Sequence, residues 1–208
     1  VQIAGADPAQ MASAAKHCFD RGADIIDINM GCPAKKVCNR AAGSALLRDE
    51  LLVRNILSRV TEAVPVPVTL KIRLGWSKDE INATEIGLIA KDAGVVSLTV
   101  HGRTRACRFA GEVDYEAIAS IKRNVDLPIV ANGDISSPQK AKKVIEITNC
   151  DAVMIGRAAL GKPWLPSQID YFLKTGHLTE HISGSDLTEF LISHLNALYA
   201  YYGVERGL

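Results

Sequence analysis

The sequence of 208 residues has no long apolar run, and no segment approaches the roughly 18 apolar residues of a membrane-spanning helix. Aromatic residues make up only 5%, and 24 Lys and Arg against 23 Asp and Glu leave a formal net charge of +1. Because 48% of the residues are hydrophobic, the composition excludes a disordered or collagen-like chain. The near-neutral total gives no sign by itself of a polyanionic partner.

Paired cysteines are also missing. The five cysteines are odd in number and contain no Cys-x-x-Cys pair: Cys18, Cys32, Cys38, Cys107 and Cys150. Such usage is typical of a reduced protein rather than of a disulfide scaffold or a zinc module. The first residues also lack the basic segment of a signal peptide. We therefore expect a cytoplasmic protein with no metal site and no membrane contact.

A short strand, a turn with Gly or Asn, and an amphipathic helix recur along the chain. The predicted strands are Val1–Ala4, Asp24–Met30, Val68–Leu74, Ser97–His101, Pro128–Ala131 and Ala152–Ile155. The predicted helices are Pro8–Arg21, Ser44–Val64, Asn82–Ala93, Tyr115–Asn124, Pro138–Thr148, Ser167–Thr175 and Leu187–Tyr202. This alternation predicts an α/β fold of βαβ units around a parallel sheet.

The parity of side chains within the strands distinguishes an open doubly wound sheet from a (β/α)8 TIM barrel. In the segment 68–74 the even positions are apolar, while Thr69, Lys71 and Arg73 occupy the other face. A strand that helices cover on both faces should be apolar throughout. The polar face therefore favours a barrel with a polar lumen, whose active site lies at the C-terminal ends of the strands.

About six strands are visible, whereas a closed barrel has eight and takes roughly 250 residues. We expect residues 1–180 to hold strands 3–8 of the barrel, and residues 181–208 to begin an all-helical C-terminal domain. On this interpretation the chain is a fragment of a longer protein.

One cysteine stands out by its place. The segment Asn29-Met-Gly-Cys-Pro33 ends the second predicted strand, which puts Cys32 at the barrel mouth. The nearby cations Lys35, Lys36 and Arg40 favour a thiolate or a polarised thiol. A lone cysteine without such neighbours would be interpreted as a small packing residue.

Lys71 lies inside a strand on its polar face, where an unpaired ammonium group is costly to bury. A luminal salt bridge to Asp27 is one interpretation. The others are a contact to an anionic ligand, a contact to a flavin ring, and a Schiff-base lysine.

Two strand ends form a candidate phosphate site: Asn132-Gly-Asp134 ends the fifth strand and Ile155-Gly-Arg157 ends the last. In barrels the loops after strands 7 and 8 often bind phosphate through backbone N–H groups. Gly133 and Gly156 would allow a close backbone approach, and Arg157 adds positive charge.

The segment His101-Gly-Arg-Thr-Arg105 extends the fourth strand into a basic loop. It belongs to a basic set at one end of the predicted barrel, which also holds Lys35, Lys36, Arg40, Arg73, Arg108, Arg157 and Lys162. The acidic residues fall largely in the outer helices. A basic rim on a near-neutral chain indicates a nucleic-acid backbone as partner.

These residues, in this order, closely resemble the tRNA-dihydrouridine synthases, most like the bacterial B type. The matching segments are Val1–Gly5, Ile28–Val37, Leu70–Arg73, His101–Arg105, Asn132–Asp134 and Met154–Arg157. The resemblance implies an FMN enzyme that uses NADPH to reduce the C5=C6 bond of uridine in tRNA, giving 5,6-dihydrouridine. It implies no obligate protein partner.

The resemblance also implies roles for single residues. Reduced FMN would deliver hydride from N5 to C6 of the uracil, and Cys32 would be the general acid that protonates C5. The FMN contacts would be Gln2, Lys71, Asn132, Gly133, Asp134, Gly156 and Arg157, with His101 lining the same pocket. Contacts to tRNA are expected at Asn29, Lys35, Lys36, Arg103 and Arg105. Residues 1–180 would then bind flavin, and 181–208 would begin a tRNA-binding domain.

Two other functions explain part of the pattern. An aldolase or lyase barrel would use Lys71 as a Schiff-base amine, but it leaves Cys32 and the arginine loop without a role. A truncated, non-catalytic RNA-binding chain would explain the basic rim alone.

Overall fold

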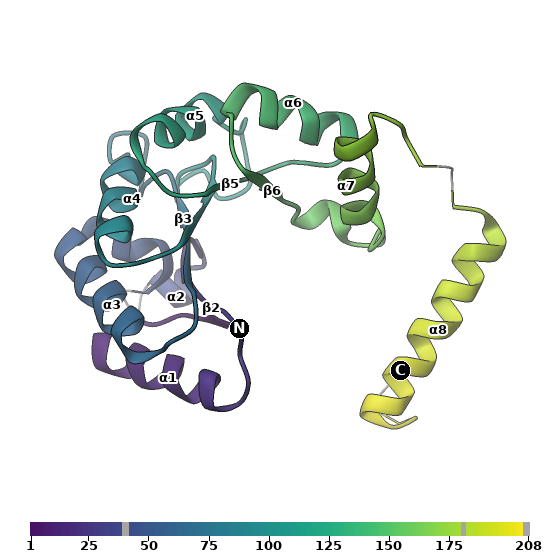
Figure 1. The fold of residues 1–208 in the computed structure, drawn as a ribbon, viewed down its shortest axis with the longest axis horizontal. Coiled ribbons are helices and arrows are strands. Elements are labelled where there is room, and N and C mark those ends of the chain that lie inside the picture. Colours follow the sequence, from purple (N-terminus) through teal and green to yellow (C-terminus); the bar gives the residue numbers. More distant parts are fainter. Residues whose placement is uncertain (39–41, 180–181, 206–208) are drawn as a thin grey trace.

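The computed structural model describes residues 1–38, 42–179 and 182–205. Its strands form one parallel sheet in the sequential order β1-β2-β3-β4-β5-β6 (Figure 1). They are β1 (Gln2–Ile3), β2 (Ile26–Met30), β3 (Val68–Arg73), β4 (Ser97–His101), β5 (Ile129–Asn132) and β6 (Ala152–Met154). Sequential parallel order with a crossover after each strand is the arrangement of consecutive barrel strands. The predicted α/β class and partial TIM barrel are therefore confirmed.

Helices follow the strands and cover the convex side of the sheet (Figure 1). The α-helices are α1 (Pro8–Asp20), α2 (Lys35–Cys38), α3 (Glu50–Ala63), α4 (Ala83–Asp92), α5 (Tyr115–Asn124), α6 (Pro138–Thr148), α7 (Leu165–Thr175) and α8 (Gly184–Tyr202). Two 3-10 helices, η1 (Gly43–Arg48) and η2 (Arg157–Ala159), complete the described elements. As predicted, α1 begins at Pro8, and the Asp7 carboxylate before it accepts a hydrogen bond from the Gln10 N–H at 2.8 Å.

The predicted single helix Ser44–Val64 is wrong. Residues 43–48 form η1, and α3 begins only after Asp49, where the backbone is extended (φ −137°, ψ 85°). The Asp49 carboxylate accepts a hydrogen bond from the Leu52 N–H at 2.9 Å. Asp49 therefore caps a new helix instead of continuing the old one.

The two faces of each strand differ as their parity predicts. The apolar face of β2 packs beneath the helices, with Ile26, Ile28 and Met30 fully buried. On the other face, strand register aligns the mostly polar residues in three rows. The row nearest the strand starts holds Gln2, Asp27, Thr69 and Ser97, and the middle row holds Asn29, Lys71 and Thr99. The row at the strand ends holds Arg73, His101, Asn132 and the apolar Met154. The concave face of the sheet is therefore the polar, lumen-like face.

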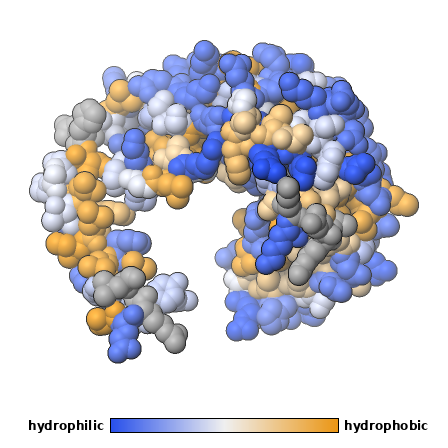
Figure 2. Space-filling model, turned by 180° about the vertical axis from the view of Figure 1, so that it is seen from behind, coloured by the Kyte–Doolittle hydropathy of each residue, from blue (hydrophilic) through white to orange (hydrophobic). Residues whose placement is uncertain are grey.

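Helix α8 lies apart from the sheet and its covering helices (Figures 1 and 2). It begins at Gly184, three residues before the predicted start, because Ser183 and Asp186 form a capping box there. An edge-to-face contact joins its Phe190 to Trp164, with ring centres 5.9 Å apart. The predicted domain boundary at 180/181 falls outside the described residues. Within the described ranges, no helix is both long and apolar enough to cross a membrane.

Candidate active site

A cavity of about 680 Å³ opens at the C-terminal ends of the strands. Its walls hold ten of the predicted site residues: Gln2, Asn29, Cys32, Lys71, His101, Asn132, Gly133, Asp134, Gly156 and Arg157. They come from loops and strands spread over more than 150 positions of the sequence. The fold therefore brings together the thiol, the amine and both glycine-containing strand ends.

Cys32 lies in the tight turn that follows β2, half-buried at the cavity wall. The side-chain oxygen of Asn29 accepts hydrogen bonds from the N–H groups of Gly31 at 3.0 Å and Cys32 at 3.1 Å. The Asn29 amide in turn donates to the side-chain oxygen of Gln2 at 2.8 Å. Asn29 was expected to contact tRNA, but both ends of its side chain are engaged within the chain. Its observed role is to shape the turn that carries Cys32.

The side chain of Gln2 connects Asn29, and with it the Cys32 turn, to Asp27 in the row nearest the strand starts. Its amide donates to one carboxylate oxygen of Asp27 at 2.6 Å, and the Thr69 hydroxyl donates to the other at 2.7 Å. Asp27 is thus occupied by neutral donors. No salt bridge joins it to Lys71 within the described residues, so the luminal ion pair is not formed.

Lys71 projects from β3 into the cavity, half-buried. Its ammonium group makes no hydrogen bond or ion pair with any described residue. Burial, and then the nearby charge of Arg73, lower the pKa of Lys71 below its usual value, while Asp27 opposes the shift. A cation in this state is stabilised by an electron-rich or anionic ligand entering the cavity.

His101 ends β4 and is only 7% exposed. Burial, followed by the charges of Arg73, Lys71 and Arg103, lowers the pKa of His101 to about 3. The imidazole is therefore neutral at pH 7, so it can donate or accept a hydrogen bond in the cavity without adding charge.

This depressed pKa makes the stability of the fold depend on pH. The unfolded chain binds a proton at His101 below about pH 6.5 but the folded chain does not, so acid favours unfolding. We expect the free energy of unfolding to fall by about 2 kcal/mol between pH 7 and pH 5 from this residue. In His101→Gln this part of the pH dependence should vanish from urea-unfolding curves. The matched variant His17→Gln, at an exposed position of α1, should retain it.

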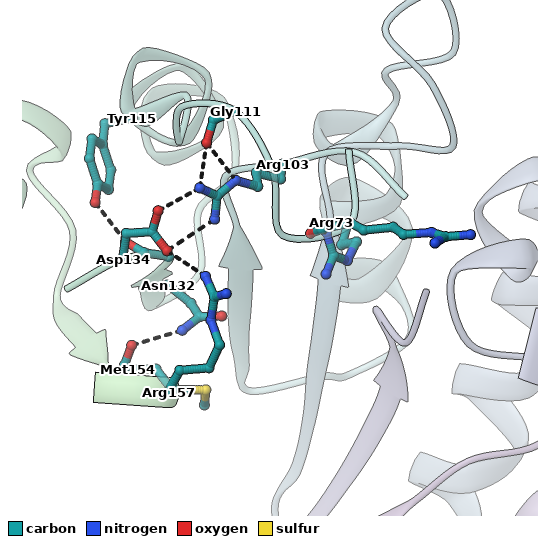
Figure 3. A network of polar contacts seen from close by, with 10 residues as sticks. Arg73, Arg103, Gly111, Tyr115, Asn132, Asp134, Met154 and Arg157 are labelled. Atoms are coloured by element: carbon teal, nitrogen blue, oxygen red, sulfur yellow. Dashed lines mark hydrogen bonds and ion pairs between the residues drawn. The ribbon is translucent and has the colours of Figure 1, made fainter. Parts of the chain in front are cut away.

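Asp134 is the centre of an ion-pair network at the end of β5 (Figure 3). It receives two hydrogen bonds from Arg103, one of them 3.1 Å long, and one from Arg157 at 2.9 Å. The Arg103 hydrogen bond is the largest of the effects that hold the pKa of Asp134 below its usual value. Arg103 also donates to the Gly111 carbonyl oxygen and has a side chain only 2% exposed. The Arg103 guanidinium group therefore has its partners within the chain.

Gly133 precedes Asp134 with φ +131°, a backbone conformation that favours glycine. A Cβ atom there would lie 2.9 Å from the side chain of Val113, so the close approach also requires glycine. The Gly133 carbonyl accepts a hydrogen bond from the Tyr115 hydroxyl at 2.6 Å, and the Asn132 amide donates to the Met154 carbonyl at 2.8 Å. The ends of β5 and β6 are therefore tied together in a fixed geometry. Apart from its two chain neighbours, no described residue has an atom within 4 Å of a Cβ built on Gly156, so the space beside it is open.

Arg73 was expected on the basic rim, but it is 2% exposed. Its guanidinium group donates to three backbone carbonyls: Gly31 at 2.9 Å, Thr104 at 3.0 Å and Arg108 at 2.6 Å. Burial and the charge of Arg103 lower its pKa to about 10, so it stays charged at pH 7. Arg73 therefore joins the Cys32 turn to the loop after β4.

Phe109 is the site residue that the sequence analysis missed. It lines the cavity with 52% of its surface exposed, and the guanidinium carbons of Arg73 and Arg157 lie 5.5 Å and 4.8 Å from its ring centre. A single aromatic residue within an arginine-rich loop was the available signal.

The remaining rim residues lie outside the cavity wall. Lys35 and Lys36 form part of α2, where Lys36 is exposed. Arg105 is half-buried and lies over the ring of Trp76, 4.3 Å from its centre. Arg108 and Lys162 are exposed, and Arg40 lies outside the described residues.

A parallel βα sheet with its polar cavity at the strand ends defines the chain as a partial β/α barrel. A solved 6-hydroxypseudooxynicotine amine oxidase from Pseudomonas geniculata N1 shares the fold, with a TM-score of 0.60 and 20% identity over 80% of this chain and 28% of that one. Residues 1–208 match the family described as Dihydrouridine synthase (Dus). The chain belongs to this family.

Curated relatives agree with the family match. The chain is 56% identical to tRNA-dihydrouridine synthase B of Pseudomonas aeruginosa and 51% identical to that of Salmonella typhimurium, in each case over 100% of its own length. It spans 63% and 64% of the lengths of these two proteins. The resemblance noted in the sequence is thereby confirmed.

Proposed function

We propose that the cavity binds FMN and the uracil ring of a tRNA uridine, and that the site reduces the uridine to 5,6-dihydrouridine with NADPH as electron donor. One observation carries the proposal: Cys32 and the unpaired Lys71 line the same cavity. At one end this cavity is bounded by the ends of β5 and β6, with Gly133 and Gly156. The names of the curated relatives support the same activity.

The residues present fit FMN. Lys71 offers a half-buried cation without an internal partner, as the electron-rich edge of a reduced flavin ring requires. At the other end, the open side of Gly156 and the half-exposed Arg157 suit a phosphate group. When bound, FMN would supply hydride to C6 of the uracil after reduction by NADPH.

The side chains around the flavin position would hold and orient it. Asn132, Gly133 and Asp134 line the wall between Lys71 and Arg157, and Gln2 on β1 lines it on the other side of Lys71, each in a fixed hydrogen-bonded position. Neutral His101 adds a hydrogen-bonding group without a second charge beside Lys71. Groups fixed before the ligand arrives reduce the ordering cost of binding.

Cys32 would act as the proton donor. A thiol at the cavity wall can give its proton to C5 of the uracil when hydride reaches C6, and the thiolate that remains lies near the buried charge of Arg73. The thiol needs no base to activate it in this role, and no base contacts it in the described part of the chain.

The RNA would bind across the exposed cations of the strand-end face. The target base must leave the stack to reach a thiol inside the cavity. Lys36, Lys35 and Arg108 would neutralise the phosphates around it, while Arg105 and Trp76 offer a stacked planar surface. We place Arg103 and Asn29 outside this set because their polar groups are engaged internally.

The proposal is tested by FMN binding. Lys71→Met keeps the length of the side chain but removes its charge, so we expect at least a tenfold loss of FMN affinity in fluorescence titration, about 1.4 kcal/mol. The control Lys143→Met, on α6, should bind FMN as the unaltered chain does. Equal affinity in Lys71→Met and the unaltered chain would rule out the proposed contact.

One observation also favours a Schiff-base reaction: Lys71 is an unpaired amine with a lowered pKa. Borohydride treatment with an aldehyde or ketone substrate would then fix a covalent adduct on Lys71, and FMN would not bind. Binding of FMN without such an adduct supports the reductase.

A further inference from the structure

The backbone of Cys32 is held from both sides. On one side its N–H donates to the side chain of Asn29 at 3.1 Å. On the other, its carbonyl oxygen accepts two hydrogen bonds from Ser44, from the N–H at 3.1 Å and from the hydroxyl at 2.8 Å.

Ser44 can hold the Cys32 carbonyl in place because the segment that carries Ser44 is buried in the core. It is fully buried, and Leu46 and Leu47 of the same 3-10 helix are each 1% exposed. Gly43 has φ +61°, and a Cβ atom there would lie 2.8 Å from the Cys32 carbonyl oxygen. Glycine therefore lets η1 approach the turn closely enough for Ser44 to reach it.

We propose that Ser44 is a positioning residue for Cys32. Its two hydrogen bonds fix the plane of the peptide group that follows Cys32, and Asn29 fixes the one before it. Together they set the direction in which the Cα–Cβ bond enters the cavity. The inference deepens the proposed function, since it rests on Cys32 being the proton donor. It also assigns a function to η1 as an element separate from α3, because η1 carries Ser44 to the Cys32 turn.

Alkylation of the thiol tests the proposal without FMN or tRNA. In Ser44→Ala the Cys32 carbonyl loses the hydroxyl, its closest donor, and keeps the Ser44 N–H at 3.1 Å and the weaker Cys38 thiol at 3.6 Å, so the turn should open more often. We expect iodoacetamide to label Cys32 about fivefold faster, the factor that corresponds to one hydrogen bond. Cys150, which is 6% exposed, reports unfolding of the whole chain in the same peptide digest. Its labelling rate should not change.

The matched control is Thr61→Val, which removes a hydroxyl that donates to the Ala93 carbonyl at 2.7 Å, far along the chain from Cys32. It should leave the labelling of Cys32 unchanged. Gly43→Ala should reproduce the effect of Ser44→Ala, because its methyl group displaces the same carbonyl oxygen. In a dihydrouridine assay, Ser44→Ala should lower kcat with KM for tRNA unchanged.

Faster labelling of Cys32 alone would support the positioning role. An alkylation rate of Cys32 in Ser44→Ala within about twofold of that in the unaltered chain would overturn it. Equal increases at Cys32 and Cys150 would also overturn it, because the loss of one hydrogen bond should raise the labelling rate at this turn and nowhere else. Absence of dihydrouridine formation by the unaltered chain with FMN, NADPH and tRNA would instead count against the proposed function, which the labelling rates do not measure.

Discussion

Replacement of Cys32 by alanine should lower the rate of dihydrouridine formation at least 100-fold, because a positioned proton donor contributes roughly 10²–10⁴-fold. Hydride transfer to C6 leaves negative charge at C5, and no other thiol lines the cavity. The binding of FMN and tRNA should persist, since the hydrogen bonds that hold the turn involve the backbone of Cys32 rather than its thiol. The measurement is mass spectrometry of nucleosides from tRNA after single-turnover reaction.

Cys18→Ala is the matched control. It removes a half-buried thiol from α1, outside the cavity, and should leave the rate unchanged. Undiminished product in Cys32→Ala, with the same FMN content, would exclude the thiol as the proton donor.

Replacement of Asp134 by alanine should produce the largest loss of stability. It leaves the 2%-exposed Arg103 guanidinium without its anion, and breaking a buried pair costs roughly 3–5 kcal/mol. We expect about 2–3 kcal/mol, at or below the lower end of that range, because the Asp134 side chain is 44% exposed. Chemical unfolding at neutral pH measures the loss. The free energy of unfolding of Asp134→Asn should lie between those of the unaltered chain and Asp134→Ala.

The control is Asp126→Ala, which removes an ion pair with Lys91 on a side chain that is 92% exposed. Its unfolding midpoint should hardly change. The pH dependence separates the two acid-sensitive residues. Since Asp134 has a lowered pKa, its contribution is present above about pH 4 and is lost below it, whereas the His101 effect begins near pH 6.5. A midpoint for Asp134→Ala equal to that of the control would contradict the network's role.

Much of the fold could be predicted because its signals are local. Alternation in β3 places Lys71 on the lumen face, and Asp7 with Pro8 marks the start of α1. The break at Asp49 could not be predicted from the same kind of signal. Its carboxylate can continue a helix surface or cap a new helix, and the approach of η1 to the Cys32 turn decides which.

The site shows the same division. Strand ends with Gly, Asn, Cys and Arg predicted which side chains meet at the cavity, because parallel strands end at one edge. What each side chain does there depends on partners distant in the sequence. Arg103 and Arg73 look like rim cations in the sequence, but Asp134 and three backbone carbonyls bind them inside the chain. Ser44 gave no sequence signal, since its partner is a carbonyl group twelve residues away.

The most direct test of the central proposal uses the unaltered chain with FMN, NADPH and tRNA that lacks dihydrouridine. We predict that the chain binds one FMN and that uridine gains two hydrogen atoms, detected by mass spectrometry, only when chain, FMN and NADPH are all present. With deuterated solvent, the deuteron delivered through Cys32 should appear at C5. Bound FMN that is reduced by NADPH without any dihydrouridine in the tRNA would contradict the proposed reaction.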